Sequence, residues 1–185
     1  MSDIRVASRY AKSVIDLAIE KGCLDEVHTD MLSFATICKE NRELVSLLKS
    51  PIVKSDKKLK ILDLIFNGKV NALTLAFFKI ITQKSREQAL PSIADEVHNQ
   101  YNILKGIQTA QVITASPLND ALRDEFKKLV VDSTGKQVDL TETVDEELIG
   151  GYILRIADQQ IDESIKSKLN NIKVKFSSNP FISKL

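Results

Sequence analysis

The sequence has no tryptophan, and aromatic residues make up only 5% of its 185 positions. Neither sign of charge dominates, because the sequence has 26 lysine and arginine residues and 25 aspartate and glutamate residues. Proteins that bind nucleic acid usually present a basic surface, and those that stack bases need aromatic rings. We therefore expect no nucleic acid among the partners of this chain.

Long apolar runs are also missing. The longest, ALTLAFFKII at residues 72–81, is interrupted by Lys79 and falls short of the ~18 residues that cross a membrane. The N-terminal stretch MSDIRVASRY lacks the basic and then apolar pattern of a signal peptide. These features predict a soluble chain that reaches a membrane only indirectly, through other proteins.

Cysteine is scarce, with Cys23 and Cys38 as its two occurrences. Both fall within one expected helix, roughly 22 Å apart along its axis. A disulfide needs Cα atoms within about 7 Å of each other. Reduced thiols and a cytosolic compartment are therefore expected.

Apolar residues in the first part of the chain recur at spacings of three and four, which is typical of amphipathic helices. The first helix carries this stripe on Ala7, Ala11, Val14 and Ala18, widened by Tyr10 and Leu17. Helices are expected at residues 7–18, 24–38, 42–50, 55–66, 71–84 and 90–106. Their short connections favour antiparallel neighbours, so we predict a six-helix bundle over residues 1–105.

The pattern changes at Gly106. The segment IQTAQVITA is rich in β-branched residues, and YILRIA alternates apolar and polar side chains, as strands do. We expect a strand at 107–115, a helix at 118–135, strands at 136–144 and 152–157, a turn at 158–160 and a helix at 165–176. The predicted fold class is mainly α, with the bundle followed by a small α+β domain at residues 106–185.

The stretch STGK at 133–136 resembles the end of a phosphate loop. That motif requires a glycine five residues before Gly135 and a serine or threonine after the lysine. This chain has Val130 and Gln137 at those positions. We interpret the stretch as the end of a helix, with Gly135 in the left-handed conformation.

Two aspartates near a glycine pair could indicate a metal or catalytic site. Divalent cations need six or more oxygen ligands, or His and Cys, and no cluster with suitable spacing accompanies these residues. The preferred interpretation is structural, with glycines that bend the backbone, Asp158 in a turn and Asp162 as the cap of the last helix. The residues concerned are Gly150, Gly151, Asp158, Asp162 and Ser164.

His28 and His98 are far apart in the sequence, and we expect both at the surface. A catalytic histidine needs a partner within hydrogen-bond reach, and the sequence indicates none. No nucleophile elbow, zinc pattern or dinucleotide fingerprint occurs either. We therefore expect a protein without catalytic residues, metal or cofactor.

Four stretches follow one another along nearly the whole chain: VASRYAKSVIDLAIEKG, SPIVKSDKKLKILDLIF, ITASPLND and VDEELIGGYILRIADQQIDESIKSKL. Together they resemble the delta subunit of bacterial F-type ATP synthase, the counterpart of the mitochondrial oligomycin-sensitivity-conferring protein. The last stretch is the most specific. It departs from the family at Ala157, where glycine usually precedes the turn aspartate. Because a positive φ is costly for alanine, we expect a different type of turn.

The resemblance implies a non-catalytic stator subunit that resists rotor torque during proton-driven ATP synthesis. Its helical domain would bind the N-terminal helices of the alpha subunits of the catalytic head. Its C-terminal domain would bind the C-terminal end of the b subunits of the peripheral stalk. The protein would lie peripherally at the cytoplasmic face of the bacterial inner (plasma) membrane.

In this family, a groove between the first and fifth helices receives the alpha-subunit helix. The resemblance therefore assigns partner binding to Ala7, Tyr10, Ala11, Val14, Ala76, Phe77 and Ile80. Small residues such as Ala7 and Ala11 would permit a close approach of the foreign helix. The same residues could instead serve only to hold the bundle together.

Two alternatives stay open. One is a stand-alone helical protein-interaction adaptor with an unrelated partner, and the other is an enzyme that uses Asp158 or Asp162. The last helix carries Lys166, Lys168, Lys173 and Lys175. These charges could steer a partner, although they could equally form a solvated face.

Overall fold

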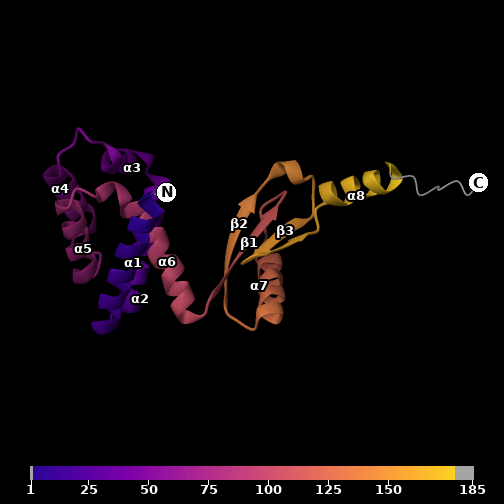
Figure 1. The fold of residues 1–185 in the computed structure, drawn as a ribbon, viewed down its shortest axis with the longest axis horizontal. Coiled ribbons are helices and arrows are strands. Elements are labelled where there is room, and N and C mark those ends of the chain that lie inside the picture. The colour runs from indigo at the N-terminus through magenta and orange to yellow at the C-terminus, as the bar shows by residue number, and fades with distance from the viewer. Residues whose placement is uncertain (1, 178–185) are drawn as a thin grey trace, which may run out of the picture. The chain divides into compact units, whose positions relative to one another are not determined.

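The structure, a computed structural model, describes residues 2–177. The chain divides into two compact units, Met1–Leu104 and Lys105–Leu185, and each has a hydrophobic core of its own. The sequence placed the boundary at Gly106. The predicted fold class is confirmed, because the first unit is helical and the second combines helices with a small sheet (Figure 1).

The first unit is a bundle of helices. Its elements are α1 (Ser2–Glu20), α2 (Leu24–Glu40), α3 (Arg42–Lys49), α4 (Ser55–Phe66), α5 (Ala72–Gln83), the 3-10 turn η1 (Glu87–Ala89) and α6 (Leu90–Lys105). Their apolar faces meet in one core. At its centre the rings of Phe34, Phe66 and Phe78 pack with centroids 5.0 to 5.5 Å apart. Such aromatic contacts add to the free energy gained from burial alone.

Polar side chains fix the start of α5 against α2. Asn71 caps α5, since its side chain accepts a hydrogen bond from the backbone N–H of Leu73. Asp30 of α2 accepts hydrogen bonds from the backbone N–H of Asn71, at 2.7 Å, and from the hydroxyl of Thr74, at 2.8 Å. These bonds satisfy donors that a helix start leaves without partners, and they hold α5 in place.

A buried ion pair joins α4 to η1. Lys58 Nζ lies 2.7 Å from Glu87 Oε1 and also donates to the backbone oxygen of Leu48, at 2.8 Å. The side chains of Lys58 and Glu87 are only 4% and 8% exposed. Charges this deeply buried need partners, so the pair ties three segments of the bundle together.

The second unit is a four-stranded sheet with one helix packed on it. Its elements are β1 (Gln108–Thr114), α7 (Asp120–Thr134), β2 (Val138–Val144), the 3-10 turn η2 (Glu146–Leu148), β3 (Tyr152–Ile156), β4 (Gln159–Asp162) and α8 (Ile165–Ser177). The strand order is β2-β1-β3-β4. β1 pairs with β2 in parallel and with β3 antiparallel, and β3 pairs with β4 antiparallel. Parallel neighbours need a crossover connection, and α7 supplies it.

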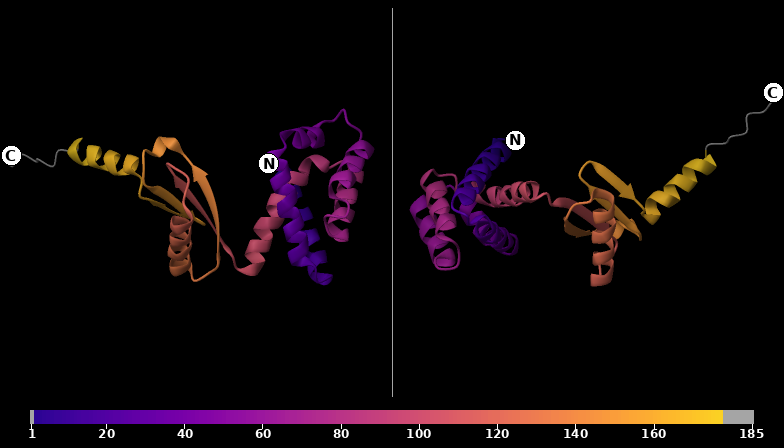
Figure 2. Two further views of the ribbon diagram at one scale, coloured as in Figure 1. Left: turned by 180° about the vertical axis from the view of Figure 1, so that it is seen from behind. Right: turned by 90° about the horizontal axis from the view of Figure 1, so that it is seen from below.

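Alternate residues of the strands form the core of this unit. Ala110, Val112, Leu154 and Ile156 are buried against Phe126 and Val130 of α7. Figure 2 shows α7 along one face of the sheet. Gly135 ends α7 in the left-handed conformation, with φ 67°, as predicted.

The sequence missed β4. Residues 158–160 were expected to form a turn, but the turn consists of Ala157 and Asp158, and Gln159 already belongs to β4. The prediction failed because β4 is only four residues long and none of its residues is buried. Alternation of apolar and polar residues, the sign of a half-buried strand, cannot show in such a segment.

Candidate functional site

An apolar groove opens between α1 and α5 of the helical unit. Its volume is about 350 Å³. It is lined by Tyr10, Ser13, Val14, Leu17, Lys21, Ala72, Leu73, Ala76, Phe77 and Ile80. Leu17 and Ile80 are 42% and 52% exposed, which is high for large apolar side chains on a packed bundle. The groove therefore presents apolar surface that the unit itself does not cover.

Five of the seven residues assigned to partner binding line this groove: Tyr10, Val14, Ala76, Phe77 and Ile80. The other two do not. Ala7 is 2% exposed and Ala11 is fully buried, and both belong to the core of the bundle. These two alanines therefore do not line the groove, because their small side chains serve the packing of the unit's own helices.

Small residues nevertheless shape the groove, on the other helix. Ala72 and Ala76 are both exposed, lie one helical turn apart on α5 and line the groove. Residues four apart lie on the same helix face, so the pair leaves a shallow path along α5. Leu17 also lines the groove. It extends the apolar stripe of α1 in the sequence but was not assigned to binding.

Tyr10 is held from two sides at the groove. Its ring lies edge-on to that of Phe77, with centroids 6.4 Å apart. Arg86 donates a hydrogen bond to the Tyr10 hydroxyl, at 3.3 Å, and its guanidinium lies 5.7 Å from the centre of the ring. An aromatic side chain with a fixed orientation loses little conformational entropy on binding, which makes Tyr10 a suitable anchor for a partner.

The glycine pair of the family signature packs against the chain between β4 and α8. A Cβ at Gly150 would stand 2.8 Å from Cδ1 of Ile165, and one at Gly151 would stand 2.4 Å from the backbone oxygen of Glu163. Gly151 also has φ 79°. The pair forms a bend before β3, as predicted. The close approach of the Glu163 backbone and the positive φ explain glycine at 151, whereas a Cβ at 150 would meet only the end of the Ile165 side chain.

Asp162 does not cap the last helix, contrary to our prediction. It ends β4, and Ser164 is the cap instead, with its hydroxyl accepting a hydrogen bond from the N–H of Ser167, at 3.2 Å. Asp162 Oδ1 accepts from the N–H of Ser164, and its Oδ2 accepts from the Ser167 hydroxyl. These hydrogen bonds, from Ser164 first and Ser167 second, hold the pKa of Asp162 below its ordinary value. Asp162 and Ser164 together accept the hydrogen bonds at the start of α8 that the sequence analysis assigned to Asp162 alone.

Asp158 lies in the turn between β3 and β4, as predicted. The residue before it, Ala157, does not avoid a positive φ, although a different type of turn was expected. Ala157 has φ 49°, so the turn keeps a positive φ even though its first residue is alanine. The pairing of Ile156 with Gln159 leaves only two residues for the connection, and tight hairpins require a positive φ.

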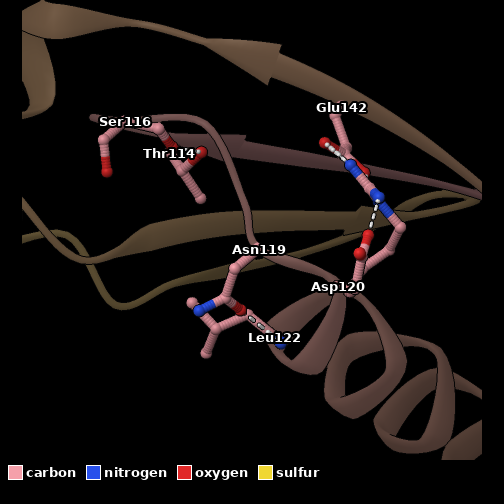
Figure 3. Close-up of polar contacts among 7 residues, drawn as sticks. Thr114, Ser116, Asn119, Asp120, Leu122 and Glu142 are labelled. Atoms are coloured by element: carbon pink, nitrogen blue, oxygen red, sulfur yellow. Dashed lines mark hydrogen bonds and ion pairs between the residues drawn. The ribbon is translucent and has the colours of Figure 1, made fainter.

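A second hollow, of about 500 Å³, lies where α7 begins. Asn119 caps α7 by accepting a hydrogen bond from the Leu122 N–H, at 2.8 Å (Figure 3). Arg123 bridges Asp120 of its own helix and Glu142 of β2. The hydrogen bond from Arg123 lowers the pKa of Glu142. Leu122 and Phe126 of α7 line this hollow, together with Ile149, a β-branched residue with φ 65°.

The sequence predicted two separate histidines at the surface, but the structure brings them into contact. His28 Nε2 of α2 lies 3.0 Å from His98 Nδ1 of α6, and both residues are half-buried. The Tyr101 ring stacks on His28 with centroids 3.6 Å apart, and its hydroxyl donates to Asp25 Oδ1. The two histidines are 70 positions apart in the sequence, so local patterns did not predict this contact between α2 and α6.

Residues 2–177 contain no group of three His, Cys, Asp or Glu side chains placed to hold a metal ion. The described helices also include none with the length and hydropathy of a membrane span. Among the thiols, Cys38 is buried, and burial together with the nearby Asp95 raises its pKa to about 11.

Comparison with known families identifies a match over almost the whole chain. The model of the family "ATP synthase delta (OSCP) subunit" matches residues 6–176. The chain is 44% identical to ATP synthase subunit delta of Cytophaga hutchinsonii, over 96% of its own length and 97% of that protein's. It is 41% identical to ATP synthase subunit delta of Amoebophilus asiaticus, over 95% and 96%.

The fold also resembles that of a solved structure. A chain in the cryo-EM structure of the Toxoplasma gondii mitochondrial ATP synthase hexamer superimposes with a TM-score of 0.74. The alignment covers 94% of this chain and 98% of that one, with 20% sequence identity. At this identity the likeness concerns the fold alone.

Proposed function

The chain belongs to the ATP synthase delta (OSCP) family, and we propose that it is the stator subunit that links the catalytic head of the enzyme to its peripheral stalk. As a family member it is a structural, non-catalytic component of F-type ATP synthase. The observation that carries the proposal is the apolar groove between α1 and α5.

The groove suits an amphipathic helix. A helix bound in a groove inserts apolar side chains spaced three, four and seven positions apart. Leu17 and Ile80 offer exposed apolar contacts to such a row, while Ala72 and Ala76 let the bound backbone approach α5 closely. We assign this groove to the N-terminal helix of an alpha subunit.

The second unit supplies the other contact. It has its own hydrophobic core, so its stability under force does not depend on the helical unit. It also exposes apolar side chains that its own core does not use, among them Ile149 and Leu169. We assign the C-terminal end of the stalk b subunits to this unit.

A chain with two such contacts can oppose torque. One unit would grip the head and the other the stalk, and the continuous polypeptide between them would transmit the force. The head would then stay still while the rotor turns, so that rotation drives ATP synthesis. The protein would sit at the cytoplasmic face of the bacterial inner membrane, attached through the complex.

Reconstitution tests this function directly. Membranes stripped of the catalytic head and of this protein should rebind added head, and recover proton-driven ATP synthesis, only when the full chain is returned. A variant with Ala76→Glu, which places a charge in the groove, should fail to restore rebinding. Head that rebinds equally well without the chain would contradict the stator role.

A further inference from the structure

Helix α8 presents an apolar face that no described residue of the second unit, up to Ser177, buries. None of its residues, Ile165–Ser177, is buried. Leu169 is 55% exposed and Phe176 is 85% exposed. In Figure 1, α8 continues beyond the sheet and covers neither of its faces. An isolated helix of this length is marginal in water, so its apolar residues indicate a partner.

The apolar residues of α8 follow a heptad. Ile165, Leu169, Ile172 and Phe176 succeed one another at spacings of four, three and four. This order places Ile165 and Ile172 at position d, and Leu169 and Phe176 at position a. The apolar stripe is therefore the narrow seam that coiled coils use, and not the broad face of a helix that packs on a globular core.

Lysine occupies every position beside that seam. In this register, Lys166 and Lys173 stand at position e, and Lys168 and Lys175 stand at position g. The outward positions b, c and f carry Asn170, Asn171, Ser167 and Val174. Charges at e and g select the partner of a coiled coil, because they face the e and g side chains of the other helix.

Two of these lysines form ion pairs within the unit. Lys168 pairs with Glu163 at 2.6 Å and Lys166 pairs with Glu147 at 3.5 Å. The lysine side chains in these pairs remain 60% and 58% exposed. Exposed pairs of this kind are weak. The carboxylates of a bound helix can therefore take the place of Glu147 and Glu163 as partners of these lysines.

From this pattern we propose that α8 is one strand of a heterotypic coiled coil, whose partner helix has an apolar a and d seam flanked by glutamate or aspartate at e and g. Pairing of α8 with a second copy of itself is disfavoured, since lysines would face lysines. A membrane surface is disfavoured by the seam, because helices that lie on membranes bury a wide apolar face.

The inference deepens the stalk contact assigned above, and it rests on that proposed function for the identity of the partner. Without that function, the inference specifies only the chemistry of the partner, which is a helix with an apolar heptad seam and acidic side chains beside it. In the assembled enzyme that helix would belong to the end of a b subunit. Binding would order α8 and convert an exposed seam into a buried one.

The test uses the full-length chain and two synthetic helices that share one apolar seam. One carries glutamate at all e and g positions, and the other carries lysine there. The glutamate peptide should bind saturably in a fluorescence anisotropy titration and should slow hydrogen exchange of the α8 amides. Equal binding of the lysine peptide, or protection confined to other elements, would overturn the proposal.

Two charge-matched variants locate the contact. Lys173→Glu with Lys175→Glu reverses charges beside the seam, and Lys127→Glu with Lys128→Glu reverses two exposed charges on α7. The first pair should weaken binding of the glutamate peptide by about tenfold or more, because like charges then face each other. The second pair should leave it unchanged. Equal effects from both variants would mean general charge attraction and would overturn the proposal.

Further probes separate this inference from its alternatives. Leu169→Asp should abolish peptide binding without unfolding the chain, because that side chain is exposed in the unit. Vesicles with an anionic phospholipid should not protect α8, and protection by vesicles but not by the glutamate peptide would replace the proposal with a membrane contact.

A soluble C-terminal fragment of the b subunit distinguishes failure of the inference from failure of the stalk assignment. If the fragment binds and Lys173→Glu with Lys175→Glu does not weaken it, the coiled coil is wrong and the stalk contact stands. If the glutamate peptide binds α8 and the fragment does not bind the chain, the acidic-helix surface stands and the stalk assignment fails.

Discussion

Gly151 lies directly against the backbone oxygen of Glu163. A Cβ at residue 151 would stand 2.4 Å from that oxygen and 3.0 Å from Cα of Ser164. Neither atom belongs to a flexible side chain, so the backbone itself would have to move. Two segments of the backbone therefore touch at this point, and glycine is required at position 151 for a steric reason.

Substitution at this contact should be costly. Gly151→Ala combines a backbone collision with a positive φ and should lower the unfolding free energy of the second unit by about 2–4 kcal/mol. Gly135→Ala is the matched control, because its φ of 67° is similar and a Cβ there would meet nothing within 4 Å. The control should lose about 1 kcal/mol. Hydrogen exchange of the β3 and α8 amides measures both, and equal losses would contradict the collision.

Restoring glycine in the hairpin should have the opposite effect. Ala157 holds φ 49°, so Ala157→Gly removes strain and should stabilise the hairpin by about 0.5–1 kcal/mol after the entropy gained by the unfolded chain is subtracted. Exchange rates of the β4 amides report the change. The control Ala121→Gly, within α7, should destabilise the same unit by about 1 kcal/mol. Loss of stability in both variants would mean that Ala157 is not strained.

Removing one member of the buried ion pair should destabilise the helical unit. Lys58→Met strands the Glu87 carboxylate and should cost about 3–5 kcal/mol, whereas the double variant with Glu87→Leu should recover most of the loss. Urea unfolding followed by circular dichroism measures both. Lys79→Met, at an exposed pair with Asp63, should cost at most about 1 kcal/mol. Similar losses at Lys58 and Lys79 would show that the buried pair contributes no more than a surface pair.

The raised pKa of Cys38 predicts a dependence on alkaline pH. Its thiol ionises at about 11 in the folded chain and at 9.0 when exposed, so the unfolded state releases this proton first as pH rises. The unfolding free energy should therefore fall between pH 9 and pH 11, and Cys38→Ala should reduce that fall. At pH 8 a thiol reagent should modify the partly exposed Cys23 and spare Cys38. Equal modification of both thiols would contradict the burial of Cys38.

The sequence predicted the elements that bury a periodic face and missed those that depend on contacts between distant residues. Eight helices and three strands followed from the spacing of apolar residues, whereas β4 has no buried residue to create a pattern. Ala7 and Tyr10 share the apolar stripe of α1, but only the packing of α1 within the bundle decides that the first is core and the second lines the groove.

The polar sites show the same limit. Asp162 and Ser164 were both recognised, yet which of them caps α8 depends on where β4 ends, and that end was not predicted. The contact of His28 with His98 spans two helices, and nothing local to either residue indicates it. Local chemistry identified these residues, and the tertiary fold set their roles.

The central claim is that the groove between α1 and α5 receives a helix from the catalytic head. The most direct measurement is calorimetric titration of the full-length chain with a peptide of the alpha-subunit N-terminus. Saturable binding should vanish in Ala76→Glu, within the groove, and persist in Ala121→Glu, an exposed alanine on α7. Binding that survives Ala76→Glu unchanged, or that is absent from the native chain, would contradict the account.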